Sequence, residues 1–261
     1  MAFKLDDFII DRIEMGMAET FAGDPLYTLT QLTDATIKIS ADSKEAKDKD
    51  GTLVKKFWKG KTGTFEATNA MLNINVIGSA SGSGKIVASE SAPINMPKII
   101  KVKAGTTVTI KDYVDGTVKV NALATNGTMG KAYAKGVSAS ASEFALTSEG
   151  VLTPPTDSAE TMYVVKYKRK VTDGVSIVNK ADKFPGTVRL TLKALGVDPC
   201  DADTLRACYI VLPSFQVSPE VEIGLTTDAT MAYTGDLQVD YCAADKTLYE
   251  IYWASDDEED E

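Results

Sequence analysis

The alternation of apolar and polar side chains is longest over residues 52–77, which form two strand-like runs on either side of residues 59–63. Phe57 and Phe65 belong to this every-second-residue pattern, which places one set of side chains on each face of a sheet. At about 3.3 Å per residue, an arm of about ten to twelve residues spans roughly 35 Å, whereas an average strand holds about five or six residues. The pattern predicts a long projecting hairpin that turns at 59–63 and whose free edges require a partner.

The second arm of this predicted hairpin changes phase along its length. Phe65 and Ala67 lie at odd positions, whereas Leu72 and Ile74 lie at even ones. A shift of one residue moves the apolar set to the opposite face of a strand. We therefore expect a bulge or kink near residues 69–70.

Shorter alternating runs, separated by turn signals, fill most of the remaining chain and make the predicted fold mainly β. They are residues 8–17, 26–39, several strands within 99–123, 143–147, 162–171, 188–195, 208–212, 221–225 and 237–253 with a break at 243–246. One short helix is expected at 201–208, because Asp201 follows Pro199 and can act as the N-cap.

The stretch 40–51 is nearly all polar and mixes charges of both signs. Such a composition favours an exposed loop or a short helix ahead of the predicted hairpin. It is also a candidate contact loop between subunits, and its candidate contact residues are Lys44, Glu45, Lys47 and Asp48.

The texture of the sequence changes between residues 78 and 97. Residues 78–85, GSASGSGK, end like a phosphate-binding loop, but Ser79 stands where the first glycine is required and Ile86 where a hydroxyl residue is required. A flexible Gly/Ser connector is therefore favoured. The expected domains are a first domain in two parts, an inserted Ig-like β-sandwich between the parts, and an acidic disordered tail. Their ranges are 1–92 and 173–255, 93–172, and 256–261 respectively.

Charge is concentrated at one end of the sequence. The formal net charge is −9, and the last six residues, DDEEDE, contribute −6 of it. Successive like charges repel one another, which favours a solvated tail; an acidic patch that docks on a basic partner is the alternative. The basic run Lys166, Lys168, Arg169 and Lys170 fits an exposed strand face better than a nucleic-acid strip, which requires more stacking aromatics and basic surroundings.

Candidate chemistry is sparse. The 261 residues contain no histidine, the commonest general base and metal ligand, so we expect a protein that is not an enzyme and uses no cofactor or metal. Cys200, Cys208 and Cys242 fit neither a zinc site nor a disulfide framework, and buried thiols are favoured over a Cys200–Cys208 bridge. No apolar run approaches the ~18–20 residues that span a bilayer, and the first residues lack signal-peptide features. A cytosol-like compartment is expected.

The sequence resembles virion structural proteins of tailed bacteriophages, particularly tail tube subunits. The resemblance is carried by the N-terminal strands, the charged stretch 44–51, the hairpin and the C-terminal run LPSFQVSPEVEIGLTTD...GDLQVDYCAADKTLYEIYW. The resemblance covers residues 1–90 and 175–253. It implies a tail-tube-like antiparallel β-sandwich with a long hairpin, in hexameric rings that stack into a tube with a continuous β-barrel lumen. The insertion departs from a minimal tube subunit and is expected to decorate the outside.

This resemblance implies a structural protein that forms a conduit for DNA delivery. Expected partners are other copies of the chain and other tail or head–tail proteins, with no membrane contact and no specific binding of the DNA in the lumen. The expected location is the virion tail, after synthesis in the host cytoplasm. The hairpin residues expected in the assembly surface are Lys55, Lys56, Phe57, Trp58, Lys59, Lys61, Phe65, Glu66, Asn69, Asn73 and Asn75.

Two alternatives are open at this point. A head decoration or head–tail connector protein would use its β domains to bind a capsid lattice instead of itself. A carbohydrate- or surface-binding β module would display aromatic platforms, whereas the two tryptophans, Trp58 and Trp253, both lie in expected strands.

Overall fold

The computed structural model describes residues 7–199, 201–241 and 245–258. Within these ranges the protein is mainly β, as the sequence predicts, and has a single helix. The chain divides into two compact units: unit 1 combines residues 1–85 with 177–261, and unit 2 comprises residues 86–176. Unit 2 contains the stretch 93–172 that the sequence singles out as an insertion. Its status as a separate domain stays a prediction.

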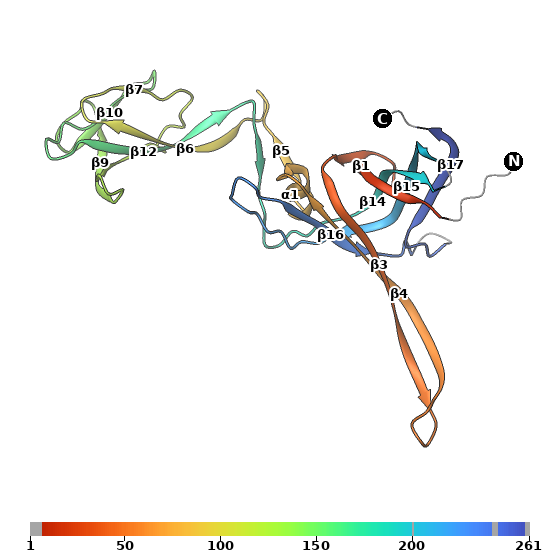
Figure 1. The fold of residues 1–261 in the computed structure, drawn as a ribbon. Coiled ribbons are helices and arrows are strands. Elements are labelled where there is room, and N and C mark those ends of the chain that lie inside the picture. The colour runs from red at the N-terminus through yellow and green to blue at the C-terminus, as the bar shows by residue number, and fades with distance from the viewer. Residues whose placement is uncertain (1–6, 200, 242–244, 259–261) are drawn as a thin grey trace. The chain divides into compact units, whose positions relative to one another are not determined.

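Unit 1 is built on one eight-stranded sheet in the order β2-β1-β14-β15-β16-β4-β3, with β17 also paired to β15. The strands are β1 (Ile9–Glu19), β2 (Pro25–Leu29), β3 (Leu32–Lys47), β4 (Leu53–Asn69), β14 (Thr187–Asp198), β15 (Asp201–Val217), β16 (Met231–Leu237) and β17 (Glu250–Glu258). All neighbours pair antiparallel. Because β1 also contacts β3, far along this order, the sheet curls on itself (Figure 1).

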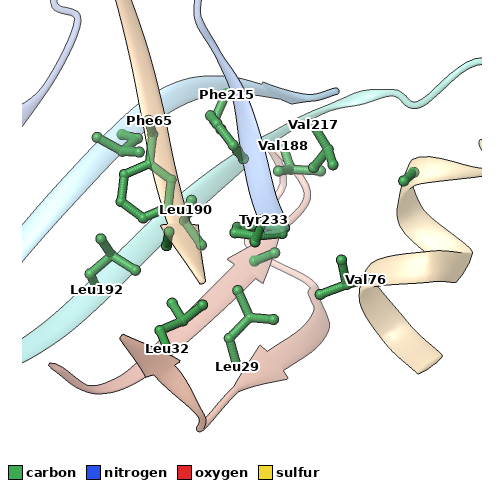
Figure 2. Close-up of a cluster of buried hydrophobic side chains, with 14 of the residues drawn as sticks. Leu29, Leu32, Phe65, Val76, Val188, Leu190, Leu192, Phe215, Val217 and Tyr233 are labelled. Atoms are coloured by element: carbon green, nitrogen blue, oxygen red, sulfur yellow. The ribbon is translucent and has the colours of Figure 1, made fainter. Parts of the chain in front are cut away.

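The hydrophobic core of unit 1 lies inside this curl. Figure 2 shows Phe65, Phe215 and Tyr233 beside aliphatic side chains of β2, β3 and β14. The rings of Phe65 and Phe215 meet edge to face with centroids 5.8 Å apart. Each fully buried side chain of this size stabilises the fold by about 1.5–3 kcal/mol. The curl does not close completely, since a cavity of about 480 Å³ separates the first residues of β1 from those of β3.

The helix α1 (Ile74–Ala80) follows β4 directly and packs its buried Val76 and Ala80 against this core (Figure 2). Asn73 is its N-cap, and its side-chain oxygen accepts hydrogen bonds from the backbone N–H groups of Asn75 and Val76 at 2.9 and 3.3 Å. The break expected near residues 69–70 is present, but the strand ends there instead of bulging. The segment expected as a Gly/Ser connector begins inside this helix.

Unit 2 contains a seven-stranded sheet in the order β6-β12-β8-β9-β10-β11-β7. The strands are β6 (Ile94–Lys103), β7 (Val108–Thr109), β8 (Lys119–Leu123), β9 (Met129–Gly136), β10 (Glu143–Leu146), β11 (Val151–Thr153) and β12 (Met162–Val171). Its separate core includes Phe144, Leu152 and Tyr163, and the β9–β10 pair is parallel. A two-stranded sheet of β5 (Lys85–Val87) and β13 (Val175–Ile177) lies where the chain passes between the two units.

Three sequence expectations about unit 1 need correction. Residues 201–208 form the start of β15 and not a helix, because pairing with β14 and β17 outweighs the local preference. Residues 221–225 form no strand. The backbone of 256–258 belongs to β17, so the acidic run does not begin as a disordered tail, and 259–261 lie outside the described residues.

Candidate assembly surface

The long hairpin of unit 1 is formed by β3 and β4 and turns at residues 48–52. Its pairing runs from Leu32 opposite Asn69 to Lys47 opposite Leu53. The predicted turn at 59–63 is therefore wrong, since these residues lie inside β4. The stretch 40–47, expected as a loop or helix, forms the other arm. Figure 1 shows the two strands extending past the rest of their sheet.

The tip of the hairpin is organised by Asp48. Its side-chain oxygen accepts hydrogen bonds from the backbone N–H groups of Asp50 and Thr52 at 2.9 and 2.8 Å. Gly51 has a φ of 85°, a left-handed conformation that glycine adopts without steric cost. Asp48, proposed from the sequence as a contact residue, thus shapes the turn itself.

The inner half of the hairpin is anchored in the core. Residues 63–69 of β4 pair with β3 on one side and β16 on the other, and Phe65 is 1% exposed. Next to it, the hydroxyl groups of Tyr233 and Tyr27 are hydrogen bonded at 2.9 Å, and burial raises the pKa of Tyr233 well above its usual value. The inner end of the hairpin is therefore held in the sheet by strand pairing on both sides and by packing against the core.

The outer half has no such neighbours. We define the distal hairpin as residues 40–47 of β3, the tip 48–52 and residues 53–62 of β4. β16 pairs with β4 only from Asn69 to Gly63, so both outer edges of the distal hairpin lack a strand partner within the described parts of the chain. Free edges of this length offer rows of unpaired backbone N–H and C=O groups to another chain.

A β-bulge in β4 decides which way the distal side chains point. Between the pairs Ala41–Lys61 and Ser43–Trp58, β4 uses one residue more than β3. Residues directly opposite each other share a face, so Trp58 shares a face with Ser43 and Ala41, which is the face that buries Phe65 further in. Without the bulge at 59–60, Trp58 would point to the opposite face.

Large apolar side chains are exposed on both faces of the distal hairpin. Trp58 is 65% exposed on the core-side face, and Phe57, opposite Lys44, is 55% exposed on the other. Lys56 lies with its Nζ 4.6 Å from the centroid of the Trp58 ring, a cation–π contact. Leu53 and Val54 extend the apolar surface toward the tip. Exposed aromatic side chains are enriched in protein interfaces.

The other candidate residues of this strand pair divide into three groups. Lys55, Lys59 and Lys61 are exposed on the distal part of β4, and Glu45 pairs with Lys47 at 3.4 Å on β3. Glu66 lies further in and forms an ion pair with Lys38 at 2.5 Å. Phe65 and Asn69 are buried, and Asn73 and Asn75 belong to the cap and first turn of α1. These last four are therefore structural and do not line an exposed hairpin.

The described residues contain no group of three or more potential metal ligands and no helix long and apolar enough to cross a membrane. Cys208 is a buried free thiol whose pKa is raised by burial. Cys200 and Cys242, considered above for a bridge and as buried thiols, lie outside the described residues.

A family model now decides the relationship: the YomU/Tube protein family matches residues 7–250. The chain belongs to this family. The expected kinship with phage tail tube proteins is thereby confirmed. A search of curated proteins finds no match.

Membership of this family bears on the role of the distal hairpin. Tail tube proteins are structural components of the virion tail that assemble with themselves and with other tail proteins. The assembly residues predicted from the sequence between Lys55 and Lys61 lie on one arm of the distal hairpin, and their role in assembly stays a prediction. The sequence analysis missed the partner strand formed by residues 40–47. The dipeptide Asp50-Gly51 was the available signal, since Asp-Gly is among the strongest marks of a hairpin turn.

Proposed function

We propose that this tail tube protein assembles into stacked hexameric rings that form a conduit for DNA, and that the distal hairpin makes the contact between neighbouring copies. The observation that carries this proposal is a hairpin anchored in the core, with exposed Trp58 and Phe57 and with two outer edges that have no strand partner among the described residues. In a lone copy such edges invite unspecific aggregation, and closure into a ring removes them. Other tail or head–tail proteins bind at the ends of the stack.

The face of the sheet opposite the core supports a lumen role. In the inner part of the hairpin it carries Thr36, Thr64 and the ion pair of Lys38 with Glu66. Where the distal hairpin begins, it carries the hydroxyls of Ser40 and Thr62, which are hydrogen bonded at 2.9 Å. Hydroxyl groups and a neutralised pair give a polar wall with little net charge. DNA passes such a wall without being held, because tight unspecific binding requires several free cations.

Electron microscopy of the purified full-length chain tests this function. We expect rings of uniform diameter with six-fold symmetry, or tubes made of them. In the decisive variant a two-residue Asn-Gly turn replaces residues 42–60, which joins the paired Ala41 and Lys61 and leaves the inner strands intact. This variant should retain its β circular-dichroism spectrum and its cooperative unfolding but form no rings.

The matched control is Asp50→Asn, which keeps a turn-forming Asn-Gly pair at the tip and should assemble normally. A wild-type chain that stays monomeric over a wide range of concentration and salt would refute the self-assembly. Rings that persist in the shortened variant would place the contact elsewhere.

A further inference from the structure

A second surface that assembly leaves unexplained lies on unit 2. The side chains of Tyr163 and Val165 in β12 point into the core, so the residues between them point outward. Lys166 lies opposite Ile99 of β6 on one side and Lys119 of β8 on the other. We name the six exposed lysines on this outer side of the three strands the basic face. They are Lys101, Lys103, Lys119, Lys166, Lys168 and Lys170.

The three strands bring no acidic side chain to the basic face. β6, β8 and β12 contain no Asp or Glu, and none of the six lysines forms an ion pair within the described residues. Lys119 and Lys166 are direct cross-strand neighbours, an arrangement that destabilises a sheet. Nearby, Ile99 is 65% exposed. The basic run noted in the sequence therefore has the basic surroundings that the sequence alone did not show.

The rest of the chain has the opposite charge. Residues 86–176 hold 11 Lys and Arg against 8 Asp and Glu, whereas the other residues hold 17 against 29. The acidic run 256–261 alone contributes six of these carboxylates. Copies with a net charge of −9 repel one another when they assemble, and the repulsion falls where opposite patches on neighbouring copies meet.

We propose that the basic face of one copy binds the acidic run 256–261 of a neighbouring copy. This inference rests on the self-assembly proposed above. It joins six lysines to six carboxylates that are present in equal number in any assembly. Within an assembly the effective concentration of the acidic run is on the order of millimolar, so weak individual ion pairs add up to a stable contact.

A nucleic acid fits the basic face less well. Proteins that bind single strands stack bases on exposed aromatic side chains, whereas Tyr163 and Tyr167 of β12 are buried on the opposite side. The outward residues beside the lysines are Ile99, Asn121 and Val164, which offer no aromatic platform. An acidic peptide segment requires only charge and reach.

Zero-length carbodiimide cross-linking of assembled protein tests the contact directly, since it forms amide bonds only between a lysine and a carboxylate that touch. Mixing isotopically heavy and light copies before assembly identifies links between different copies by mass spectrometry. We expect heavy–light links from 256–261 to the basic face. Assemblies that form without such links would overturn the inference and leave the proposed function intact.

A double-mutant cycle gives the second test. The first triple variant neutralises Lys101, Lys166 and Lys168 to Gln, and the second is Glu259→Gln, Asp260→Asn and Glu261→Gln, beyond the end of β17. Each should raise the protein concentration needed for assembly by on the order of five- to tenfold, and the combination should be no worse than either alone. Fully additive effects would contradict a direct contact.

The matched control for the first triple removes the same charge elsewhere, with Lys111, Lys180 and Lys183, all exposed, changed to Gln. This control variant should assemble at a protein concentration close to that of wild type and should keep the cross-links.

Binding of polyphosphate to assembled protein tests whether the acidic run already occupies the basic face. Polyphosphate should bind several-fold more tightly when 259–261 are neutralised; equal binding in both proteins would show that the acidic run does not occupy the basic face.

Discussion

Two halves of one strand, β4, show how differently the same residue types are used. In the inner half, residues 63–69 pair with β3 and β16, and every second side chain is buried. In the outer half, residues 53–62 pair with β3 and with no other strand of the described ranges, and all of them are exposed. Phe65 and Trp58 lie on the same face of the hairpin, but only Phe65 has the rest of the sheet against it.

The difference separates folding from assembly along a single strand. The inner aromatic ring contributes to the stability of the monomer, because water is excluded from it by residues of the same chain. The outer rings contribute nothing comparable until another chain covers them. Substitutions in the two halves should therefore change different measurements.

The largest effect is expected from Phe65→Ala. Loss of this buried ring leaves a cavity beside Phe215 and Tyr233 and should lower the free energy of unfolding by about 3–5 kcal/mol. Thermal or urea unfolding followed by circular dichroism measures the loss. A decrease below ~1 kcal/mol would show that the core relaxes around the missing ring and that the inner half is less essential than its burial suggests.

Trp58→Ala should weaken assembly and leave the stability of the fold nearly unchanged. We expect the free energy of unfolding to stay within ~0.5 kcal/mol of wild type, while assembly weakens by about 2 kcal/mol or more per contact, roughly thirtyfold in affinity. Light scattering against protein concentration, together with urea unfolding of the unassembled chain, measures both. Normal assembly of this variant would remove Trp58 from the interface.

Two glycines of β4 provide a matched pair. A Cβ on Gly63 would lie 2.7 Å from side-chain atoms of both Ile39 and Leu237, whereas a Cβ on Gly60 would meet nothing within 4 Å. Gly63→Ala should therefore cost about 1–3 kcal/mol of stability. Gly60→Ala should leave it unchanged or raise it by under ~1 kcal/mol. Equal melting temperatures for the two variants would contradict the assigned boundary between the halves.

The smallest effect is expected from Glu66→Gln, within the inner half. The ion pair with Lys38 is roughly half exposed, so its loss should cost only about 0.2–1 kcal/mol, and less at high salt. Unfolding at low and at high salt measures this. A larger, salt-independent loss would mean that the pair holds the hairpin in register.

The sequence predicts the alternation of the inner half, but not its partner strands, and it predicts the outer half poorly. Alternation from Phe65 to Asn69 survives in the structure because one face is buried, and burial is what imposes a period of two. The outer half lacks that constraint, so Gly60 and Gly63 imitate a turn inside a continuous strand. Gly60 lies at the bulge, and Gly63 lies against Ile39 and Leu237.

Other errors have a similar origin. Asp201 has good helix-capping chemistry, yet β15 forms because β14 and β17 supply strand partners that local preferences do not encode. In α1, the β-branched Ile74, Val76 and Ile77 resemble a strand, and only the Asn73 cap indicates a helix. The basic face was visible as a run in β12, but its lysines from β6 and β8 join it only through sheet pairing.

The single extra residue at the β4 bulge determines on which of the two faces of the hairpin Trp58 lies. Removing Gly60 would restore plain alternation and turn the indole of Trp58 to the other side of the ribbon, while every side chain of the hairpin is kept. In evolution, one three-nucleotide deletion would therefore change the face on which Trp58 is presented to another chain, without changing a residue of the core.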